Sequence, residues 1–124
     1  MSDLSVQLLE AMKREFQFLR QDQDFQLGDD FLDEVQLGAT ARNTFFSCKK
    51  HGAQPRLNPN HKVITALMNS RERSKTHLYY LLSAVYSIVN RAVEEIEDSH
   101  EREFHAKILE TLLAGRPGRW TDLA

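Results

Sequence analysis

Cysteine, glycine and proline are scarce in this chain of 124 residues, and each scarcity excludes something. Cys48 is the single cysteine, so no disulfide can form within the chain, and a reducing cytoplasm is its natural location. The five glycines stand singly, so none belongs to a glycine-rich loop of the kind that binds phosphates. We therefore expect one cytoplasmic domain that carries no cofactor.

The chain also lacks a strong charge of either sign and a long apolar run. Its formal net charge is −2, which argues against a nucleic-acid binder, because phosphate contacts require a basic surface. The longest uncharged stretch, 76–90, is shorter than the about 20 apolar residues that a membrane span requires. The first residues show no signal-peptide pattern. We therefore expect a soluble protein without a membrane segment or a targeting sequence.

Apolar residues instead recur every three or four positions along most of the chain, which predicts helices. The predicted helices cover roughly 3–19, 31–37, 41–51, 61–69, a long stretch from Ser70 or Ser74 to about Asp98, and a last one ending at Gly115. Thr40 is the expected N-cap of the third helix, and Asn58, followed by Pro59, that of the fourth. The last helix is expected to bury Phe104, Ile108, Leu109, Leu112 and Leu113. The prediction is an all-α, single-domain bundle of five or six helices over 1–115, with a short tail at 116–124.

The long helix has the most regular apolar stripe, and it is wide enough to face more than one neighbour. Tyrosines lie beside this stripe, and aromatic residues are enriched at protein interfaces. They would equally complete the core of a monomer, with their hydroxyls reaching water. The residues that we predict to contact a partner or a second copy are Leu78, Tyr79, Leu81, Leu82, Val85, Tyr86, Val89 and Val93.

A second pattern precedes this stripe in the stretch "SRERSKTHLYY", residues 70–80. Arg71, His77 and Tyr79 resemble the signature of HEPN ribonucleases, in which an arginine is followed by a histidine and then x-Tyr. The resemblance implies that the arginine and the histidine act at the scissile phosphate of RNA, usually across a dimer interface. A polar first turn of a long helix explains the same residues, and we prefer that interpretation.

Histidines and carboxylates near the end of the chain raise the question of a metal. His100 and His105 are five residues apart, so their rings diverge around a helix, whereas Glu101 and His105 share a face. Two ligands are fewer than the three or four that zinc usually takes. We predict no metal site.

The segment from the loop at Leu57 onward resembles the end of the Hsp90 chaperone family. Residues 57–61, "LNPNH", match a turn of that family; Leu81, Leu82 and Ala84 match its long helix; and Glu97, Asp98, Phe104 and residues 112–113 fall close to its final pattern. The resemblance covers 57–113 and implies homodimerisation, with the last helices of two protomers packed as a four-helix bundle.

These features together predict a non-catalytic protein–protein interaction module, an adaptor or regulator that dimerises or binds a helical partner. No small-molecule substrate is indicated. One alternative is a HEPN-type ribonuclease that uses Arg71, His77 and Tyr79. Another is an inhibitor or accessory subunit that docks on a basic partner through its acidic faces, Asp29–Glu34 and Glu94–Asp98.

Overall fold

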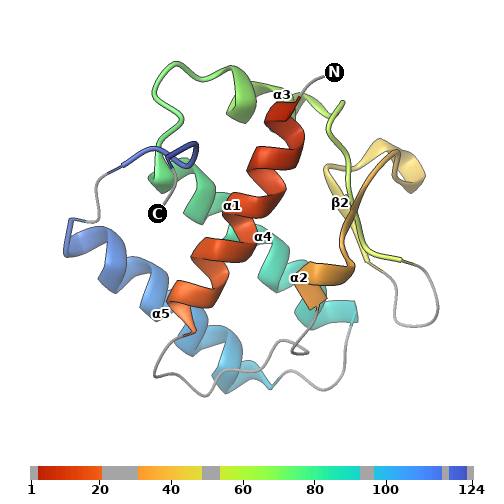
Figure 1. Cartoon of the computed structure of the whole chain (residues 1–124). Helices are drawn as coiled ribbons and strands as arrows, with labels where there is room; N and C mark the ends of the chain where they lie inside the picture. Colours follow the sequence, from red (N-terminus) through yellow and green to blue (C-terminus); the bar gives the residue numbers. More distant parts are fainter. Residues whose placement is uncertain (1–2, 21–30, 49–53, 93–96, 116–117, 123–124) are drawn as a thin grey trace.

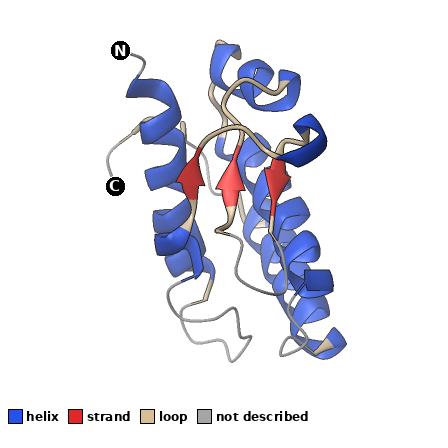
Figure 2. Ribbon diagram, turned by 90° about the vertical axis from the view of Figure 1, so that its right-hand side faces the viewer, coloured by secondary structure: helices blue, strands red, loops and turns tan. Residues whose placement is uncertain are grey.

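A computed structural model describes residues 3–20, 31–48, 54–92, 97–115 and 118–122. Helices dominate the described chain (Figure 1), so the prediction of a mainly helical fold is confirmed. The finer prediction of an all-α fold is wrong, because three short strands form a sheet on one side of the molecule (Figure 2).

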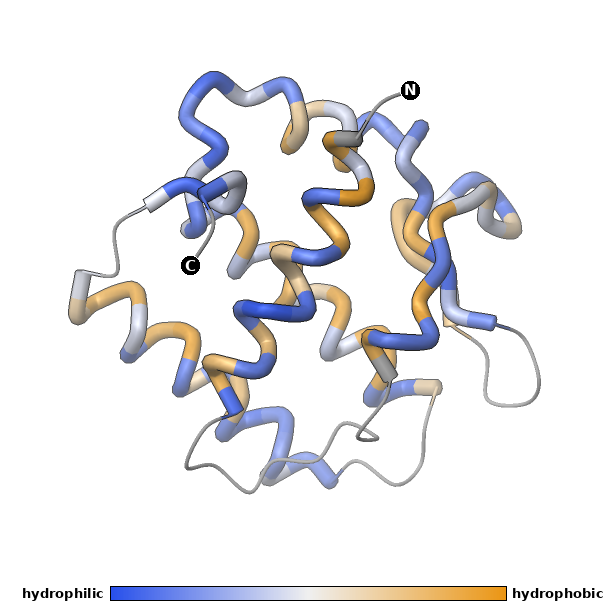
Figure 3. Tube along the Cα trace, viewed as in Figure 1, coloured by the Kyte–Doolittle hydropathy of each residue, from blue (hydrophilic) through white to orange (hydrophobic). Residues whose placement is uncertain are grey.

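Three long helices form the core. α1 (Asp3–Leu19) crosses the front of the molecule, with α4 (Lys75–Ala92) behind it and α5 (Asp98–Leu113) beside it (Figure 1). Polar and apolar residues alternate along α1 at helical spacing (Figure 3), because one face meets the core and the other meets water. Leu8, Met12 and Leu19 on its inner face are completely buried.

The second and third predicted helices are replaced largely by other structure. α2 (Phe31–Glu34) is a single turn, and β1 (Gln36–Leu37) follows it directly. A 3₁₀ turn, η1 (Ala41–Asn43), precedes β2 (Phe46–Ser47), and β3 (Arg56–Leu57) pairs with both strands, parallel to β1 and antiparallel to β2.

Thr40 occupies the N-cap position of η1 and not of an α-helix, and its side chain makes no cap hydrogen bond. Its hydroxyl donates to the carbonyl oxygen of Thr44 at 2.6 Å, which closes a tight turn in place of a helical start. Arg42 and Asn43 then take left-handed backbone angles, with φ of 60° and 51°, which a continuing α-helix does not allow. The chain leaves this turn extended, where aromatic residues such as Phe46 are favoured.

The fourth predicted helix is confirmed as α3 (Lys62–Asn69), but its N-cap is His61. The Nδ1 atom of His61 accepts the backbone N–H of Val63 at 3.1 Å. Asn58 instead fixes the preceding loop from a buried position, donating to Asn43 Oδ1 at 2.9 Å and to the carbonyl oxygen of Thr44 at 3.2 Å. The buried amide of Asn58 thus connects the loop before α3 to the turn at Asn43 and Thr44.

The long predicted helix begins at Lys75, and its described part ends at Ala92. Residues 93–96, which include Val93, lie outside the described residues, and α5 begins at Asp98. The described part of the predicted tail, Gly118–Asp122, lies against the bundle, and Trp120 is only 1% exposed. We call these five residues the strap.

Within the part of the chain described here, no helix combines the length and apolar character needed to cross a membrane.

Candidate functional site

The apolar stripe of α4 forms the centre of the protein's own core. Its seven described predicted contact residues are all buried: Leu78, Tyr79, Leu81, Leu82, Val85, Tyr86 and Val89. The ring of Tyr86 stacks on that of Phe104 in α5, with 4.1 Å between the ring centroids. Partner contact through this stripe stays a prediction, and within one chain these side chains already contact α1 and α5.

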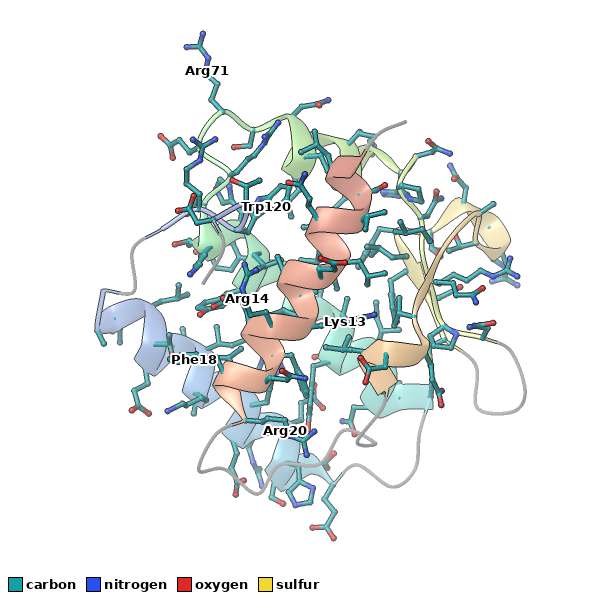
Figure 4. All side chains as sticks on the ribbon, viewed as in Figure 1. Lys13, Arg14, Phe18, Arg20, Arg71 and Trp120 are labelled. Atoms are coloured by element: carbon teal, nitrogen blue, oxygen red, sulfur yellow. The ribbon has the colours of Figure 1, made fainter. Side chains whose placement is uncertain are left out.

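Arg71, His77 and Tyr79 do not form a shared site within one chain. Arg71 is exposed in the loop before α4 and points away from the molecule (Figure 4). His77 is exposed in the first turn of α4. Tyr79 is completely buried, and its hydroxyl donates to Glu15 Oε1 at 2.7 Å. The arrangement fits the interpretation of this stretch as the polar start of a helix.

Glu15 is a completely buried carboxylate at the junction of α1, α4 and the strap. Besides the Tyr79 hydroxyl, it meets Arg14 Nε at 3.5 Å and Lys75 Nζ at 3.6 Å, both at Oε2. Arg14 also donates through Nη2 to the carbonyl oxygen of Trp120 at 3.2 Å. A buried charge is tolerated only when it is paired and hydrogen-bonded, so this cluster is a structural junction.

A row of polar side chains runs along the seam between α4 and α5. His105 lies between Ser83 Oγ, 2.6 Å from its Nδ1, and Ser87 Oγ, 3.1 Å from its Nε2. Ser87 donates to Glu101 Oε1 at 2.7 Å, and Asn90 Nδ2 donates to Glu101 Oε2. We call these five residues the seam cluster. Sequence reasoning found only Glu101 and His105; the signal for the others is a polar residue at every third or fourth position of α4.

Two groups at the seam, Glu101 of the cluster and its neighbour Tyr86, have shifted pKa values. The hydrogen bond from Ser87, followed by those from Asn90 and His105, holds the pKa of Glu101 below its ordinary value although partial burial opposes the shift. Burial, together with the negative charges of Glu101 and Glu103, raises the pKa of Tyr86 to about 12. Glu101 is therefore ionised and Tyr86 neutral near pH 7.

The seam cluster contains a serine, a histidine and a carboxylate, the residue types of a catalytic triad. Its geometry therefore has to be compared with what catalysis requires. Ser83 and Ser87 lie inside α4, where backbone N–H groups bond within the helix and are not free to stabilise an oxyanion. Among the described residues, no group of three or more His, Cys, Asp and Glu side chains could hold a metal. Burial also raises the pKa of the Cys48 thiol, which opposes reactivity. The cluster fits a role in joining α4 to α5.

The seam continues beyond the cluster as an exposed apolar patch. Since Ser83 lies opposite His105 and Asn90 opposite Glu101, helical spacing puts Tyr80, one turn before Ser83, and Leu109, one turn after His105, at the same level of the two antiparallel helices. Leu113 lies one turn further along the same ridge of α5. The exposed fractions are 62% for Tyr80, 59% for Leu109 and 87% for Leu113. The prediction that Leu109 and Leu113 are buried is therefore wrong, because the core takes only the side of α5 that carries Phe104 and Ile108.

The predicted acidic faces are described only in part. Asp33 and Glu34 in α2, and Glu97 and Asp98 at the start of α5, are exposed. The other acidic residues of these runs, at 29–30 and 94–95, lie outside the described residues. Docking of these faces on a basic partner stays a prediction.

Comparison of the chain with protein-family models, curated proteins and solved structures finds no match.

Proposed function

We propose that this protein is a non-catalytic self-association module in which α4 and α5 of two copies pack as a four-helix bundle. The observation that carries the proposal is the placement of exposed apolar side chains. Among the described residues, three of the five large hydrophobic side chains that are exposed, Tyr80, Leu109 and Leu113, belong to α4 and α5, the two helices that form the seam. An exposed apolar patch with a polar border is typical of an interaction surface.

Small residues beside the patch support close approach of a second helix pair. The register that places Tyr80 level with Leu109 also places Ala84 level with Ala106 at the next turn, and Ala106 is exposed. Small side chains let helix axes come closer together than large ones do. The Hsp90 resemblance, which covers α4 and α5, implies the same arrangement of the last helices of two protomers.

The size of the patch indicates how strong the association is. Three side chains cover far less than the about 800 Å² per partner that stable complexes bury, so the surrounding polar seam must contribute the rest. We expect a reversible dimer that dissociates on dilution, in which Tyr80 and Leu109 supply most of the binding energy.

The test is sedimentation equilibrium over a concentration series, comparing the wild type with the double variant Leu109→Glu/Leu113→Glu. Two buried charges without partners at the interface are expected to weaken dimerisation at least about tenfold. Because both side chains are exposed in one copy, the variant should keep the helicity of the wild type, and its melting temperature should match that of the wild type at dilutions where both are monomeric.

The matched control is Val6→Glu, which places a charge at an exposed apolar position of α1, away from the seam, where Val6 is 46% exposed. This variant should dimerise like the wild type. A wild-type protein that stays monomeric at its highest soluble concentration would contradict the proposal, as would an equal loss of dimer in Val6→Glu.

A further inference from the structure

A second surface, distinct from the α4–α5 seam, gathers basic side chains around the strap. The backbone of the strap is bound at three points: Lys75 N donates to the carbonyl oxygen of Gly118 at 3.1 Å, Trp120 N to that of Arg73 at 2.7 Å, and Arg14 Nη2 to that of Trp120 at 3.2 Å. Each contact brings a basic residue to the strap.

Two more guanidinium groups belong to the same surface. Arg119 of the strap donates through Nη2 to the carbonyl oxygen of Arg71 at 3.3 Å, and both residues are exposed. The guanidinium of Arg73 lies 5.9 Å from the ring centre of Trp120. Figure 4 shows Trp120 and Arg14 close to α1, with Arg71 at the edge of the molecule and pointing outward. The basic surface therefore consists of Arg14, Arg71, Arg73, Lys75 and Arg119.

The carboxylates near this surface do not neutralise it. Glu15 is buried and accepts a hydrogen bond from the hydroxyl of Tyr79. Its negative charge therefore offsets one of the cations from the interior of the protein. Asp122 accepts the backbone N–H of Arg119 at 3.3 Å, and Glu72 is exposed in the loop. Among the described residues, five cations thus face four carboxylates, because exposed Glu10 lies one turn before Arg14 on α1, in a chain whose overall charge is −2. The positive charge is a local feature.

A groove of about 510 Å³ adjoins the basic surface and shares Lys75 with it. Its lining comes from α1, α4 and the end of α5, and it combines apolar and charged residues. The lining residues are Phe18, Lys75, Lys107, Glu110, Thr111, Ala114 and Gly115. Lys107 makes no ion pair with any carboxylate in the described parts of the chain. The groove thus offers an aromatic wall beside two lysines and one glutamate.

We propose that the basic surface and the groove together bind an acidic segment of a partner protein. Carboxylates of the segment would pair with Arg71, Arg119 and Lys107, and an apolar side chain of the segment would enter the groove against Phe18. Charge complementarity supports an anionic occupant. The apolar part of the groove fits an aliphatic side chain such as leucine, and the overall charge of −2 disfavours a long polyanion such as a nucleic acid.

The test uses a fluorescein-labelled synthetic peptide of Glu-Glu-Leu repeats, with fluorescence anisotropy at low and moderate salt. The full chain should bind this peptide, and binding should weaken as salt screens the exposed charges. The variants Arg71→Glu/Arg119→Glu and Lys107→Glu should each bind about tenfold more weakly. Lys107→Glu leaves the contacts of the strap intact, so its loss of binding cannot come from an undocked strap.

Two controls separate this proposal from its competitors. Arg42→Glu/Lys62→Glu reverses two exposed charges elsewhere on the molecule and should bind the peptide like the wild type. The Leu109→Glu/Leu113→Glu variant should also retain binding, so failure of the dimer leaves this proposal standing. Absence of peptide binding at low salt, an equal loss in Arg42→Glu/Lys62→Glu, or tighter binding of an oligo-uridine of equal charge would each overturn it.

Discussion

At the scale of the residue, the most constrained position is Glu15, a carboxylate without solvent contact in a helix that otherwise buries apolar side chains. Its burial is compensated by one hydroxyl and two cations, Tyr79 and Lys75 from α4 and Arg14 from α1. Removing one partner of a buried charged group leaves that group undersatisfied, which costs more than the pair contributes. The position therefore gives the Tyr79 hydroxyl a role in stability.

Tyr79→Phe tests this role directly. The substitution removes the hydroxyl that donates to Glu15 and leaves the ring in place, so the free energy of unfolding should fall by about 1–3 kcal/mol. Urea unfolding followed by circular dichroism measures the change. Tyr80→Phe is the matched control on the next residue, where an exposed hydroxyl should matter by less than about 0.5 kcal/mol. Equal effects of the two substitutions would show that the hydrogen bond to Glu15 is not important.

A pH dependence follows from Glu101 in the seam cluster. Its pKa is lower in the folded protein than its ordinary value of 4.5, so the ionised carboxylate stabilises the fold above that pH, and this contribution is lost as the pH falls through the folded pKa. In Glu101→Gln, the free energy of unfolding should fall less steeply between about pH 5 and pH 3 than in the wild type.

Chemical denaturation at a series of pH values provides the measurement, and Glu103→Gln is the control. Glu103 is exposed on the same helix and makes none of the described contacts of the seam cluster, so its variant should keep the wild-type slope. An unchanged slope in Glu101→Gln would mean that the seam cluster does not hold the carboxylate in its ionised form.

At the scale of the element, the strap differs most from what its sequence suggests. A short segment that follows a glycine and a proline at the end of a helix is typically a free tail. Here Trp120 is buried, and the backbone around it is bound by residues of α1 and of the loop before α4. A single large aromatic residue supplies enough apolar surface to dock a short segment. The single tryptophan is the one feature of the sequence that indicates docking of this segment.

Trp120→Ala should therefore destabilise the protein by about 3–5 kcal/mol, the range for a buried aromatic residue truncated to alanine. Thermal and urea unfolding measure the change. Asp122→Ala, at an exposed position of the same strap, should have a much smaller effect. Wild-type stability of Trp120→Ala would mean that the strap does not contribute to the core.

The scale of the element also explains which predictions succeed. α1, α3, α4 and α5 follow from apolar periodicity because each repeats its pattern over at least two turns. The stretch 31–47 holds elements of two to four residues, too short for a period to be measured. There, hydrogen bonds such as that of Thr40 and contacts distant in sequence, such as Leu37 with Leu57, decide the structure.

At the scale of the whole molecule, the sequence indicates which residues are apolar but not which apolar residues stay in contact with water. The stripe of α4 was predicted as a contact surface because it is the most regular, and that regularity comes from its central position in the core. Leu109 and Leu113 were assigned to the core, although the three-helix packing leaves their side of α5 uncovered. Exposure depends on how helices are arranged in space, and no property of one helix reveals it.

The same limit applies to charge. A net charge of −2 argues against a basic surface only if charges are evenly distributed. The fold brings Arg14, the loop before α4 and the strap together. Arg14 and Trp120, which are in contact, are more than 100 residues apart in the sequence. The resulting surface is not visible in any local window of the sequence.

The small sheet has a consequence for how copies of this protein can meet. β1 and β2 lie at its two borders, and each is two residues long. Edge strands this short present too few free amide and carbonyl groups to pair with a strand of another chain. Short edge strands are one way in which proteins avoid amyloid-like aggregation. Addition of strands from a second copy at this sheet is therefore disfavoured, which agrees with placing the proposed contact on α4 and α5.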